Sequence, residues 1–277
     1  QGYRDAIDDA KQAANNLSLT TAAYTQHAIG SADLLLRSML DWLEDEHIES
    51  REQFATVLRE KRFQEAMRER IVGLPQVPIA SVFDSRGNLL STSLKWPAPD
   101  LNVAHISTFQ EMLAPDAPDM LATNASEGRV SGKWTFYISR KIRNANGVVL
   151  GAAIVGLDPQ YFATLFKSLT LGDSGWVTLF RDDGALLATS LPQAGLMGRT
   201  FPDAVPVRLA RQGLAGEATV IDGPTWWDPS YSKARVVSPR RVEGFPYLVS
   251  VNISEGAILA RWTVRAWMIA GFALALS

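Results

Sequence analysis

The sequence of 277 residues contains no cysteine, and this absence excludes disulfide bonds, thiolate metal sites and cysteine catalysis. Positive charge is not concentrated either, because 27 lysines and arginines are offset by 29 aspartates and glutamates and no long basic run occurs. Binding to nucleic acid requires a concentrated cationic surface, so a nucleic-acid partner is not expected. The chain is 47% hydrophobic and 20% charged, which favours a packed core over disorder.

The sequence motifs of common catalytic sites are also missing. The chain has no G-x-S-x-G elbow, no phosphate-binding loop and no G-x-G-x-x-G fingerprint. Its three histidines, His27, His47 and His105, are too far apart in the sequence to form a metal-type pair. The acidic residues between Glu44 and Glu49 are typical of a solvated helix end. Neither a metal nor another cofactor is therefore predicted, and any active site would have to assemble from distant residues.

The two ends of the chain carry a different signal. The first residue is glutamine, which indicates a fragment of a longer protein. Residues 267–276 read W-M-I-A-G-F-A-L-A-L, an apolar run about half as long as a membrane span. A buried core helix is an alternative, and Arg261 and Arg265 on the outer side would oppose the positive-inside tendency. We predict that residues 254–277 form a helix that enters a membrane.

Glycine and proline are scarce at the start of the chain, where Gly30 is the only glycine after Gly2 until well past residue 48. Apolar and small residues there recur at alternating steps of three and four, which predicts one long amphipathic helix over residues 1–50. At about 1.5 Å per residue such a helix spans roughly 65 Å. It can cover a sheet, and its seven-residue spacing also suits a seam between the helices of a dimer. A second helix is expected over residues 52–71.

An internal repeat organises the rest of the chain. V-F-D-S-R-G-N-L-L-S-T-S at 82–93 and L-F-R-D-D-G-A-L-L-A-T-S at 179–190 are identical at six of twelve positions. Each copy predicts a hairpin that turns at a glycine, and each is followed by an irregular connection and a second hairpin. The strands of the second hairpins are expected at 133–142 and 148–157, and at 234–242 and 247–253. The predicted fold is two copies of one α+β unit, each with an antiparallel sheet.

Aromatic residues and one arginine of the first copy are the candidate ligand-binding residues, because ligand cavities are mostly apolar and hold a few polar anchors. The irregular connection contributes three candidates: Trp96, His105 and Phe109. Side chains alternate along the strand at 133–142, and one set is expected to line the cavity: Trp134, Phe136, Ile138 and Arg140. The opposite set, expected on the other side of the strand, consists of Lys133, Thr135, Tyr137 and Ser139. Among these, Tyr137 is one further candidate.

Two charged residues are the predicted polar anchors. Arg140 can hold a carboxylate bidentately, and Asp158, which follows the last strand of the first copy, can receive an ammonium group. Each candidate also has a simpler interpretation. Trp134 and Phe136 can be ordinary core residues, and Arg140 can pair with a neighbouring acid. Asp158 can cap the helix that P-Q-Y-F-A-T-L-F-K-S-L predicts from Pro159 onward.

Together these features resemble the double Cache sensor domain, which has two PAS-like lobes on one long N-terminal helix. The resemblance covers nearly the whole chain and rests on the long helix and on V-F-D-S-R-G-N-L-L, S-G-K-W-T-F-Y-I-S-R-K-I, G-A-A-I-V-G-L-D-P-Q-Y-F and L-G-D-S-G-W-V-T-L-F-R-D-D-G-A-L-L-A. The last three are similar to the version found ahead of bacterial diguanylate cyclases and histidine kinases. The resemblance implies an extracytoplasmic receptor module, flanked by two membrane helices, with ligand in the membrane-distal lobe.

The chain departs from the ligand motifs of that family. Related sequences often carry D-x-x-x-F or D-R-x-x-F in the connection. Here V-A-H-I-S-T-F-Q has His105 and Ile106 at the first two places and keeps Phe109. The R-x-W-Y element of the amino-acid-binding version is not present. The resemblance therefore implies a small-molecule ligand without identifying it as an amino acid.

The predicted function is a periplasmic small-molecule sensor of a homodimeric receptor in the bacterial inner membrane. The module is not expected to be an enzyme, and a cytoplasmic output domain would follow residue 277. Its predicted parts are a long helix, a membrane-distal lobe, a membrane-proximal lobe and a helix entering the membrane, at 1–50, 51–165, 166–253 and 254–277. Two alternatives stay open. One is a non-sensing dimerisation or spacer module whose pocket is filled by its own side chains, and the other is an extracytoplasmic hydrolase.

Overall fold

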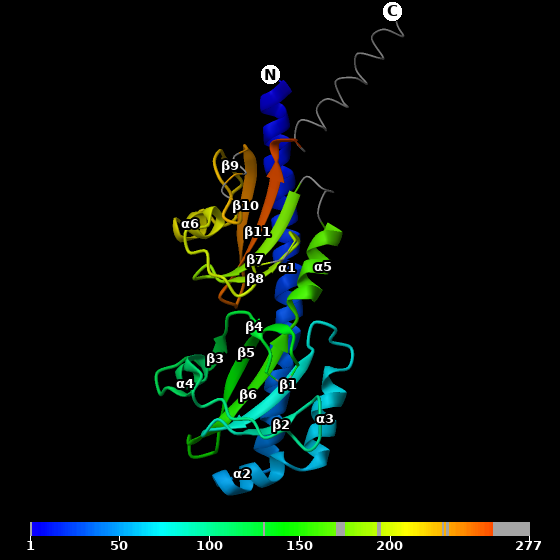
Figure 1. The fold of residues 1–277 in the computed structure, drawn as a ribbon, viewed down its shortest axis with the longest axis vertical. Helices are drawn as coiled ribbons and strands as arrows, with labels where there is room; N and C mark the ends of the chain where they lie inside the picture. The colour runs from blue at the N-terminus through cyan, green and yellow to red at the C-terminus, as the bar shows by residue number, and fades with distance from the viewer. Residues whose placement is uncertain are drawn as a thin grey trace, which may run out of the picture. The chain divides into compact units, whose positions relative to one another are not determined.

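One long helix precedes two antiparallel sheets, so the predicted α+β fold is confirmed (Figure 1). The computed structural model describes residues 2–129, 131–169, 175–192, 195–228, 230 and 233–256. The chain divides into two compact units: unit 1 combines residues 1–26 with residues 162–277, and unit 2 consists of residues 27–161. The predicted C-terminal helix lies, beyond Gly256, outside the described residues.

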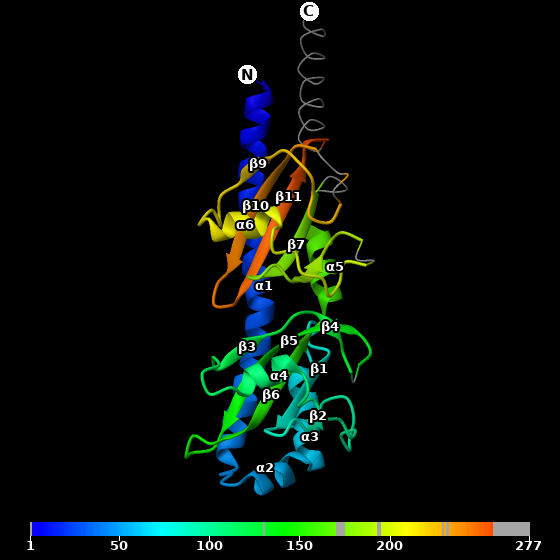
Figure 2. The same ribbon diagram turned by 60° about the vertical axis from the view of Figure 1, so that its left-hand side comes forward.

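Helix α1 (Gly2–Asp45) is the long helix predicted from the scarcity of glycine and proline. The helix belongs to unit 1 up to Gln26 and to unit 2 from His27, whereas residues 1–50 were predicted to be a separate part of the chain. In each unit the helix lies along one face of the sheet (Figures 1 and 2). Its buried side chains in unit 1 are small or polar: Ala14, Ser18, Thr21, Ala22 and Thr25. In unit 2 the larger ones are apolar: Ile29, Leu35, Leu36, Met39 and Leu43.

The helix predicted at 52–71 is two helices, α2 (Arg51–Leu58) and α3 (Lys61–Ile71). The Ser50 side chain caps α2 by accepting a hydrogen bond from the backbone N–H of Gln53 at 3.1 Å. Between the helices Glu60 is extended, with φ −68° and ψ 143°. The break redirects the chain so that both helices bury apolar side chains, namely Phe54, Leu58, Phe63 and Met67.

Unit 2 contains a six-stranded antiparallel sheet in the order β2-β1-β6-β5-β3, with β4 paired to β5. Its strands are β1 (Ile79–Asp84), β2 (Leu89–Thr92), β3 (Met120–Ala122), β4 (Ser126–Glu127), β5 (Trp134–Arg143) and β6 (Val149–Leu157). The second predicted hairpin is therefore present as β5 and β6. Helix α4 (Ser107–Leu113) lies in the irregular connection, and it covers the face of the sheet opposite α1 (Figure 2).

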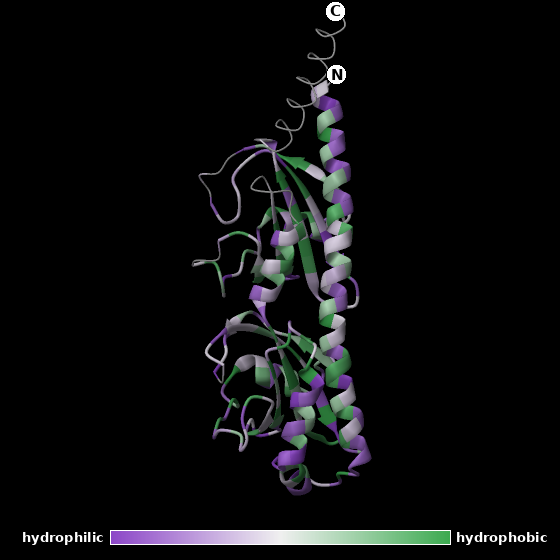
Figure 3. Ribbon diagram, turned by 90° about the vertical axis from the view of Figure 1, so that its right-hand side faces the viewer, coloured by the Kyte–Doolittle hydropathy of each residue, from purple (hydrophilic) through white to green (hydrophobic). Residues whose placement is uncertain are grey.

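Unit 1 repeats this topology in a five-stranded sheet of order β8-β7-β11-β10-β9. Its strands are β7 (Gly175–Arg181), β8 (Leu186–Thr189), β9 (Thr219–Ile221), β10 (Arg235–Val242) and β11 (Tyr247–Ser254). Helix α5 (Pro159–Leu169) leads into the unit, and α6 (Val205–Arg211) covers its sheet as α4 does in unit 2. The strands of both sheets are largely hydrophobic, as Figure 3 shows. Two matching sheets confirm the internal repeat.

Corresponding residues of the repeat have corresponding roles. Gly87 and Gly184, at the turns of the two first hairpins, have φ angles of 83° and 93°, a region that favours glycine. In unit 2 the Arg140 guanidinium donates to the Asp33 carboxylate of α1 at 2.6 Å. In unit 1 Arg240 donates to the Ser18 hydroxyl of α1 at 3.1 Å. Each sheet is thus joined to α1 by an arginine of its second hairpin.

The membrane prediction concerns residues that the structure does not describe. Among the described residues, no helix is both long enough and apolar enough to cross a membrane. Strand β11 ends at Ser254, where the predicted final helix begins.

Candidate ligand cavity

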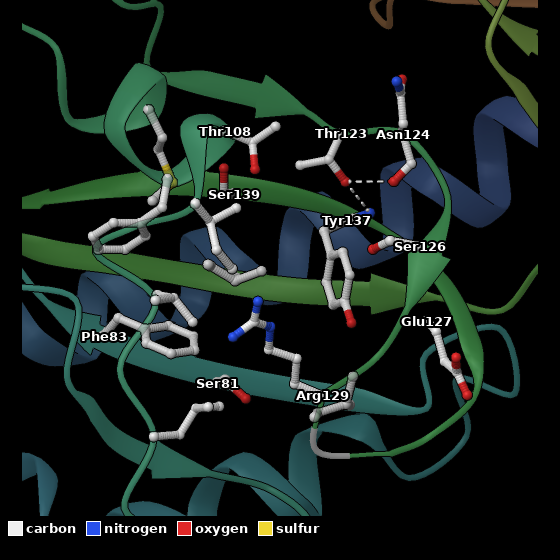
Figure 4. Close-up of a pocket in the computed structure, with 17 residues that line it drawn as sticks. Ser81, Phe83, Thr108, Thr123, Asn124, Ser126, Glu127, Arg129, Tyr137 and Ser139 are labelled. Carbon is white, nitrogen blue, oxygen red and sulfur yellow. Dashed lines mark hydrogen bonds between the residues drawn. The ribbon is translucent and has the colours of Figure 1, made fainter. Parts of the chain in front are cut away.

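A cavity of about 460 Å³ lies in unit 2, between the sheet and the segments that cover it (Figure 4). Its volume falls within the usual range of small-molecule sites, roughly 300–1,000 Å³. Strands β1, β5 and β6, helix α4 and the loops beside them supply its lining. The lining residues are Ile79, Ser81, Phe83, Leu101, Val103, Ile106, Thr108, Phe109, Met112, Thr123, Asn124, Ser126, Glu127, Arg129, Tyr137, Ser139 and Ile154.

The floor of the cavity combines β5, which carries large aromatic side chains, with β6, which contains several glycines and alanines. Tyr137 of β5 and Ile79 of β1 both face Gly156 of β6 across the sheet. A Cβ atom on Gly156 would lie 2.6 Å from Ile79 Cγ2 and 2.7 Å from Thr135 Cγ2. Two carbon atoms cannot approach each other this closely, so the absence of a side chain at Gly156 lets Ile79 and Thr135 pack against it.

The apolar end of the cavity is formed where α4 covers the sheet. Phe83 and Phe109 meet edge to face with ring centroids 6.0 Å apart, and Met112 is buried beside them. Lys141 fixes this helix from the sheet, because its ammonium group donates to the carbonyls of Ala114 at 2.6 Å and Ala117 at 2.9 Å. Those bonds satisfy a lysine that is 5% exposed.

The polar end of the cavity lies by the β4–β5 connection. The Thr123 hydroxyl accepts from the backbone N–H of Tyr137 and donates to the carbonyl of Asn124, both at 3.0 Å. Burial raises the pKa of the Tyr137 phenol, although a hydrogen bond with Thr135 acts in the opposite direction. The phenol is therefore protonated at neutral pH and can donate a hydrogen bond.

Arg129 brings a positive charge to this end. Its guanidinium reaches between Phe83 and Tyr137 in Figure 4. Glu127, the acidic residue of the lining, points its carboxylate away from that guanidinium. Across the part of the chain that the structure describes, Arg129 makes no hydrogen bond or ion pair.

Two predicted site residues, Phe109 and Tyr137, line the cavity. The set expected to do so, Phe136 and Arg140 with Ile138 between them, lies on the opposite face of β5, toward α1. There Phe136 and Ile138 are fully buried, and Arg140 donates to both carboxylate oxygens of Asp33, at 2.6 and 2.9 Å. This placement corrects the expected side of the strand. The physical reason is the acid on α1: a buried charge needs a partner, so Arg140 turns to Asp33.

Asp33 shows how tightly that pair is coupled. Burial alone would raise the pKa of the Asp33 carboxyl, but the hydrogen bonds and charges of Arg140 and Arg37 outweigh burial and hold it below its usual range. Arg37 is the weaker partner, because its side chain is 58% exposed while that of Arg140 is 13% exposed. The simpler interpretation of Arg140, an ion pair with an acid, is what the structure contains.

The remaining predicted residues lie outside the cavity lining. Trp134 is 43% exposed. Trp96 is 47% exposed and its indole N–H donates to the carbonyl of Arg59 at 3.1 Å. His105 is exposed at the surface. The Asp158 carboxylate accepts from the backbone N–H of Gln160 at 2.8 Å, as a cap of α5 does.

The corresponding region of unit 1 is occupied by aromatic rings. Phe180, the repeat counterpart of Phe83, packs against Trp226 at 5.2 Å between centroids, and Phe201 packs against the same ring at 4.7 Å. Trp176, the counterpart of Ile79, meets Trp227 edge to face at 5.8 Å. Among the described residues of unit 1, large aromatic rings therefore stand at the positions of the smaller cavity-lining residues of unit 2.

Several lining residues were not predicted from the sequence, above all Arg129, Ser81 and Thr123. One signal could have corrected the side of β5. Asp33 lies on the buried face of α1 between Ile29 and Leu36, outside the stripe predicted from the sequence, and an acid there requires a basic partner on the facing strand. No comparable local signal marks Arg129, which lies in a short connection between two strands.

The family of the chain agrees with this geometry. The Cache domain family matches residues 3–262, which span α1 and both sheets. The chain belongs to the Cache domain family. The predicted resemblance is therefore confirmed, and the cavity described above lies in one of the two sheet units of a Cache domain. No protein in the curated set matches the chain.

Several solved Cache-like structures share the fold. The extracellular domain of rpHK1S-Z16, a protein described as a histidine kinase, has a TM-score of 0.76 at 25% identity, covering 91% of this chain and 98% of its own. The ligand-binding domain of the Pseudomonas aeruginosa PAO1 amino acid chemoreceptor PctB, in complex with L-Arg, has a TM-score of 0.65 at 14% identity, with coverages of 90% and 97%. That of the Campylobacter jejuni chemoreceptor Tlp3, in complex with L-norvaline, has 0.64 at 14%, with coverages of 92% and 94%.

Proposed function

We propose that this Cache domain is the extracytoplasmic small-molecule sensor of a membrane-bound signalling receptor, and that its ligand binds in the cavity of unit 2. The observation that carries the proposal is the cavity itself, which combines an apolar end, a polar end and an unpaired guanidinium. The likeness to the extracellular domain of rpHK1S-Z16 and to chemoreceptor domains solved with amino acids supports it. Phe109 and Tyr137 are the proposed ligand contacts among the residues predicted from the sequence.

The cellular setting is part of the same proposal. We place the domain in the periplasm, anchored in the bacterial inner membrane, with the lobe at 51–165 distal and the lobe at 166–253 proximal to the membrane. The domain itself is proposed to be non-catalytic, and residues 254–277 would carry the signal toward a cytoplasmic output domain.

Strand β5 is the proposed link between ligand and helix. Its side chains alternate, so Tyr137 faces the cavity while Arg140 holds Asp33 of α1 on the other side. A ligand that moves β5 would thereby move the attachment of α1. Such a ligand must bind two conformations with different affinity, because equal affinity shifts no equilibrium.

Helix α1 also has a face suited to self-association. Leu19, Tyr24 and Leu34 are 56%, 53% and 66% exposed on it. We propose that these exposed side chains help to join two copies of the chain; the residues at the seven-residue spacing of the expected seam, Ala14, Thr21, Ala28 and Leu35, are buried instead. Sedimentation should show a dimer for the wild type and a monomer for Leu34→Asp, since a charge at the seam is costly to bury. A wild type that stays monomeric at high concentration would remove this part of the proposal.

A thermal-shift screen tests the sensing proposal directly. The 277-residue chain would be screened against small acids, amines, nucleobases, sugars and amino acids. A ligand that binds only the folded state raises the melting temperature, by mass action. Stabilisation by one chemical class supports a sensor. If no compound stabilises the chain, the alternative of a non-sensing spacer is favoured.

A further inference from the structure

The two ends of the cavity in unit 2 differ in polarity. One end is apolar, where Phe83, Phe109 and Met112 pack together. The other end presents hydrogen-bond donors, the Arg129 guanidinium and the Tyr137 phenol. A ligand that fills such a space needs an apolar body and, at one end, a group that accepts hydrogen bonds.

The Arg129 guanidinium differs from those of the two arginines of β5. Arg140 is paired with Asp33, and Arg143 donates to the carbonyl of Gly147 at 3.0 Å. For Arg129, no hydrogen bond or ion pair occurs with the residues that the structure describes. A guanidinium carries five donors in a planar fork that matches the two oxygens of a carboxylate. Arg129 is an exposed residue, and its fork lines the cavity without a partner among the described residues, so it is suited to receive the anionic end of a ligand.

The acids near the cavity do not offer a matching site for an ammonium group. Asp33 is bound to Arg140 on the other face of the sheet, and Asp158 caps α5. Glu127 lines the cavity, but its carboxylate points away from the guanidinium in Figure 4. An ammonium group next to a carboxylate held at Arg129 would thus have no acid of the described lining pointing toward it, and burying an unpaired charge is costly.

We infer that the cavity binds a small organic monocarboxylate with an apolar body and no amino group, held by Arg129 and Tyr137 at the carboxylate and by the Phe83–Phe109 wall at the other end. This inference rests on the proposed sensing function and names the ligand class. It separates this domain from sensors that recognise an amino acid through both of its charged groups. The Tyr137 hydroxyl adds a second donor from the floor of the cavity.

Two matched sets of compounds test the inference by calorimetric titration of the 277-residue chain. The first set is isocaproate, its amide and leucine, which share one branched apolar body. The second set is hydrocinnamate, its amide and phenylalanine, which share a phenyl-ethyl body. Hydrogen bonds to a charged group exceed those to a neutral one, so each amide is expected to bind roughly 10- to 100-fold more weakly than its acid. Each amino acid is also expected to bind more weakly than its acid.

Variants assign the effect to the proposed residues. Arg129→Gln should remove the preference for acid over amide, and Tyr137→Phe should reduce affinity for both acids by about 3- to 10-fold. Arg143→Gln is the matched control, because Arg143 is an exposed arginine of β5 that does not line the cavity. It should retain wild-type affinities. Circular dichroism and melting temperature verify that each variant is folded.

The outcomes separate the inference from the proposed function. Acids that bind more tightly than amides and amino acids, with a preference that Arg129→Gln abolishes, support the inference. An amino acid that binds as tightly as its acid, or a preference that survives Arg129→Gln, overturns it while leaving a sensor. If none of the six compounds binds but the broad thermal-shift screen finds another class, the inference fails and sensing stands. If that screen also finds nothing, both fail.

Discussion

Replacing Arg140 with methionine should strongly destabilise unit 2. The side chains of Arg140 and Asp33 are 13% and 11% exposed, and two hydrogen bonds join them. Methionine keeps an unbranched apolar stem but removes the charge. Asp33 then retains only Arg37, whose side chain is 58% exposed and correspondingly screened by water.

The expected cost follows from the burial of the pair. Removing one partner of a buried ion pair costs about 3–5 kcal/mol, because the other charge is left without compensation. Since Arg37 still contacts Asp33, we expect the low end of that range. With a urea m-value of about 2 kcal/mol per molar, a loss of ~3 kcal/mol lowers the unfolding midpoint by ~1.5 M. Urea titration followed by far-UV circular dichroism measures the shift.

The stability difference between the wild type and Arg140→Met is also expected to depend on pH in a defined direction. In the wild type the pKa of Asp33 is lowered, so its stabilising effect is present above the unfolded value of about 3.9 and is lost as pH falls through the folded value. Without Arg140, burial is opposed only by Arg37 and the folded pKa rises relative to that of the wild type, so the variant gains less stability than the wild type as pH rises. The difference in free energy of unfolding should therefore be largest at neutral pH and shrink toward pH 3.

Two results would refute this reasoning. One is a difference below about 1 kcal/mol at neutral pH, and the other is a difference that does not change with pH. Arg143→Met serves as the control, because that residue is exposed at the end of the same strand and bonds only to the carbonyl of Gly147. It should change the free energy of unfolding by no more than about 0.5 kcal/mol.

Two further substitutions probe the walls of the cavity. Lys141→Met removes the ammonium group that donates to the carbonyls of Ala114 and Ala117, and Ala114 keeps only the backbone N–H of Ala117. Amide hydrogen exchange over 107–117 should therefore accelerate and stability should fall by about 1–3 kcal/mol; unchanged exchange would contradict the role of Lys141 in holding α4. Gly156→Ala places a methyl group against Ile79 and Thr135 and should cost about 1–3 kcal/mol in thermal unfolding. Gly30→Ala is its control, since open space surrounds that helical position and about 0.5–1 kcal/mol of stabilisation is expected there; equal effects at both glycines would refute the packing argument.

Local patterns in the sequence predict much of the fold. The long helix follows from its periodicity and from the scarcity of glycine and proline, and the two sheets follow from a repeat that includes Gly87 and Gly184. Both features are determined by residues that are close together in the sequence, so a local pattern is enough to predict them. The break at Glu60 depends instead on which side chains the sheet of unit 2 can bury, so a single helix was expected at 52–71.

The side of β5 that faces the cavity could not be chosen from alternation alone. A strand of period two presents two equivalent sets, and a shift of one residue exchanges them. The deciding contact joins Arg140 to Asp33, which are 107 residues apart in the sequence. Tyr137 and Phe109 were identified because aromatic residues in that hairpin and connection are candidates on either side. Arg129 was missed because its role depends on where a short connection folds back.

The repeat explains why unit 2 and not unit 1 is the proposed site. At the position of Ile79, unit 1 has Trp176, which packs against Trp227. Beside Phe180, the counterpart of Phe83, unit 1 has Trp226. Among the described residues, aromatic rings of unit 1 thus pack at positions that in unit 2 border an open space of about 460 Å³.

The central claim, that a small molecule binds in the cavity of unit 2, is tested most directly by filling that cavity. Ile79→Trp copies into unit 2 the residue that unit 1 carries at the equivalent position. Leu94→Trp, at a site that is 46% exposed and outside the cavity lining, is the matched control. Calorimetric titration would use hydrocinnamate and the best stabiliser from the thermal-shift screen. The account predicts wild-type affinity in Leu94→Trp and at least a tenfold loss in a folded Ile79→Trp, whereas unchanged affinity in folded Ile79→Trp would contradict it.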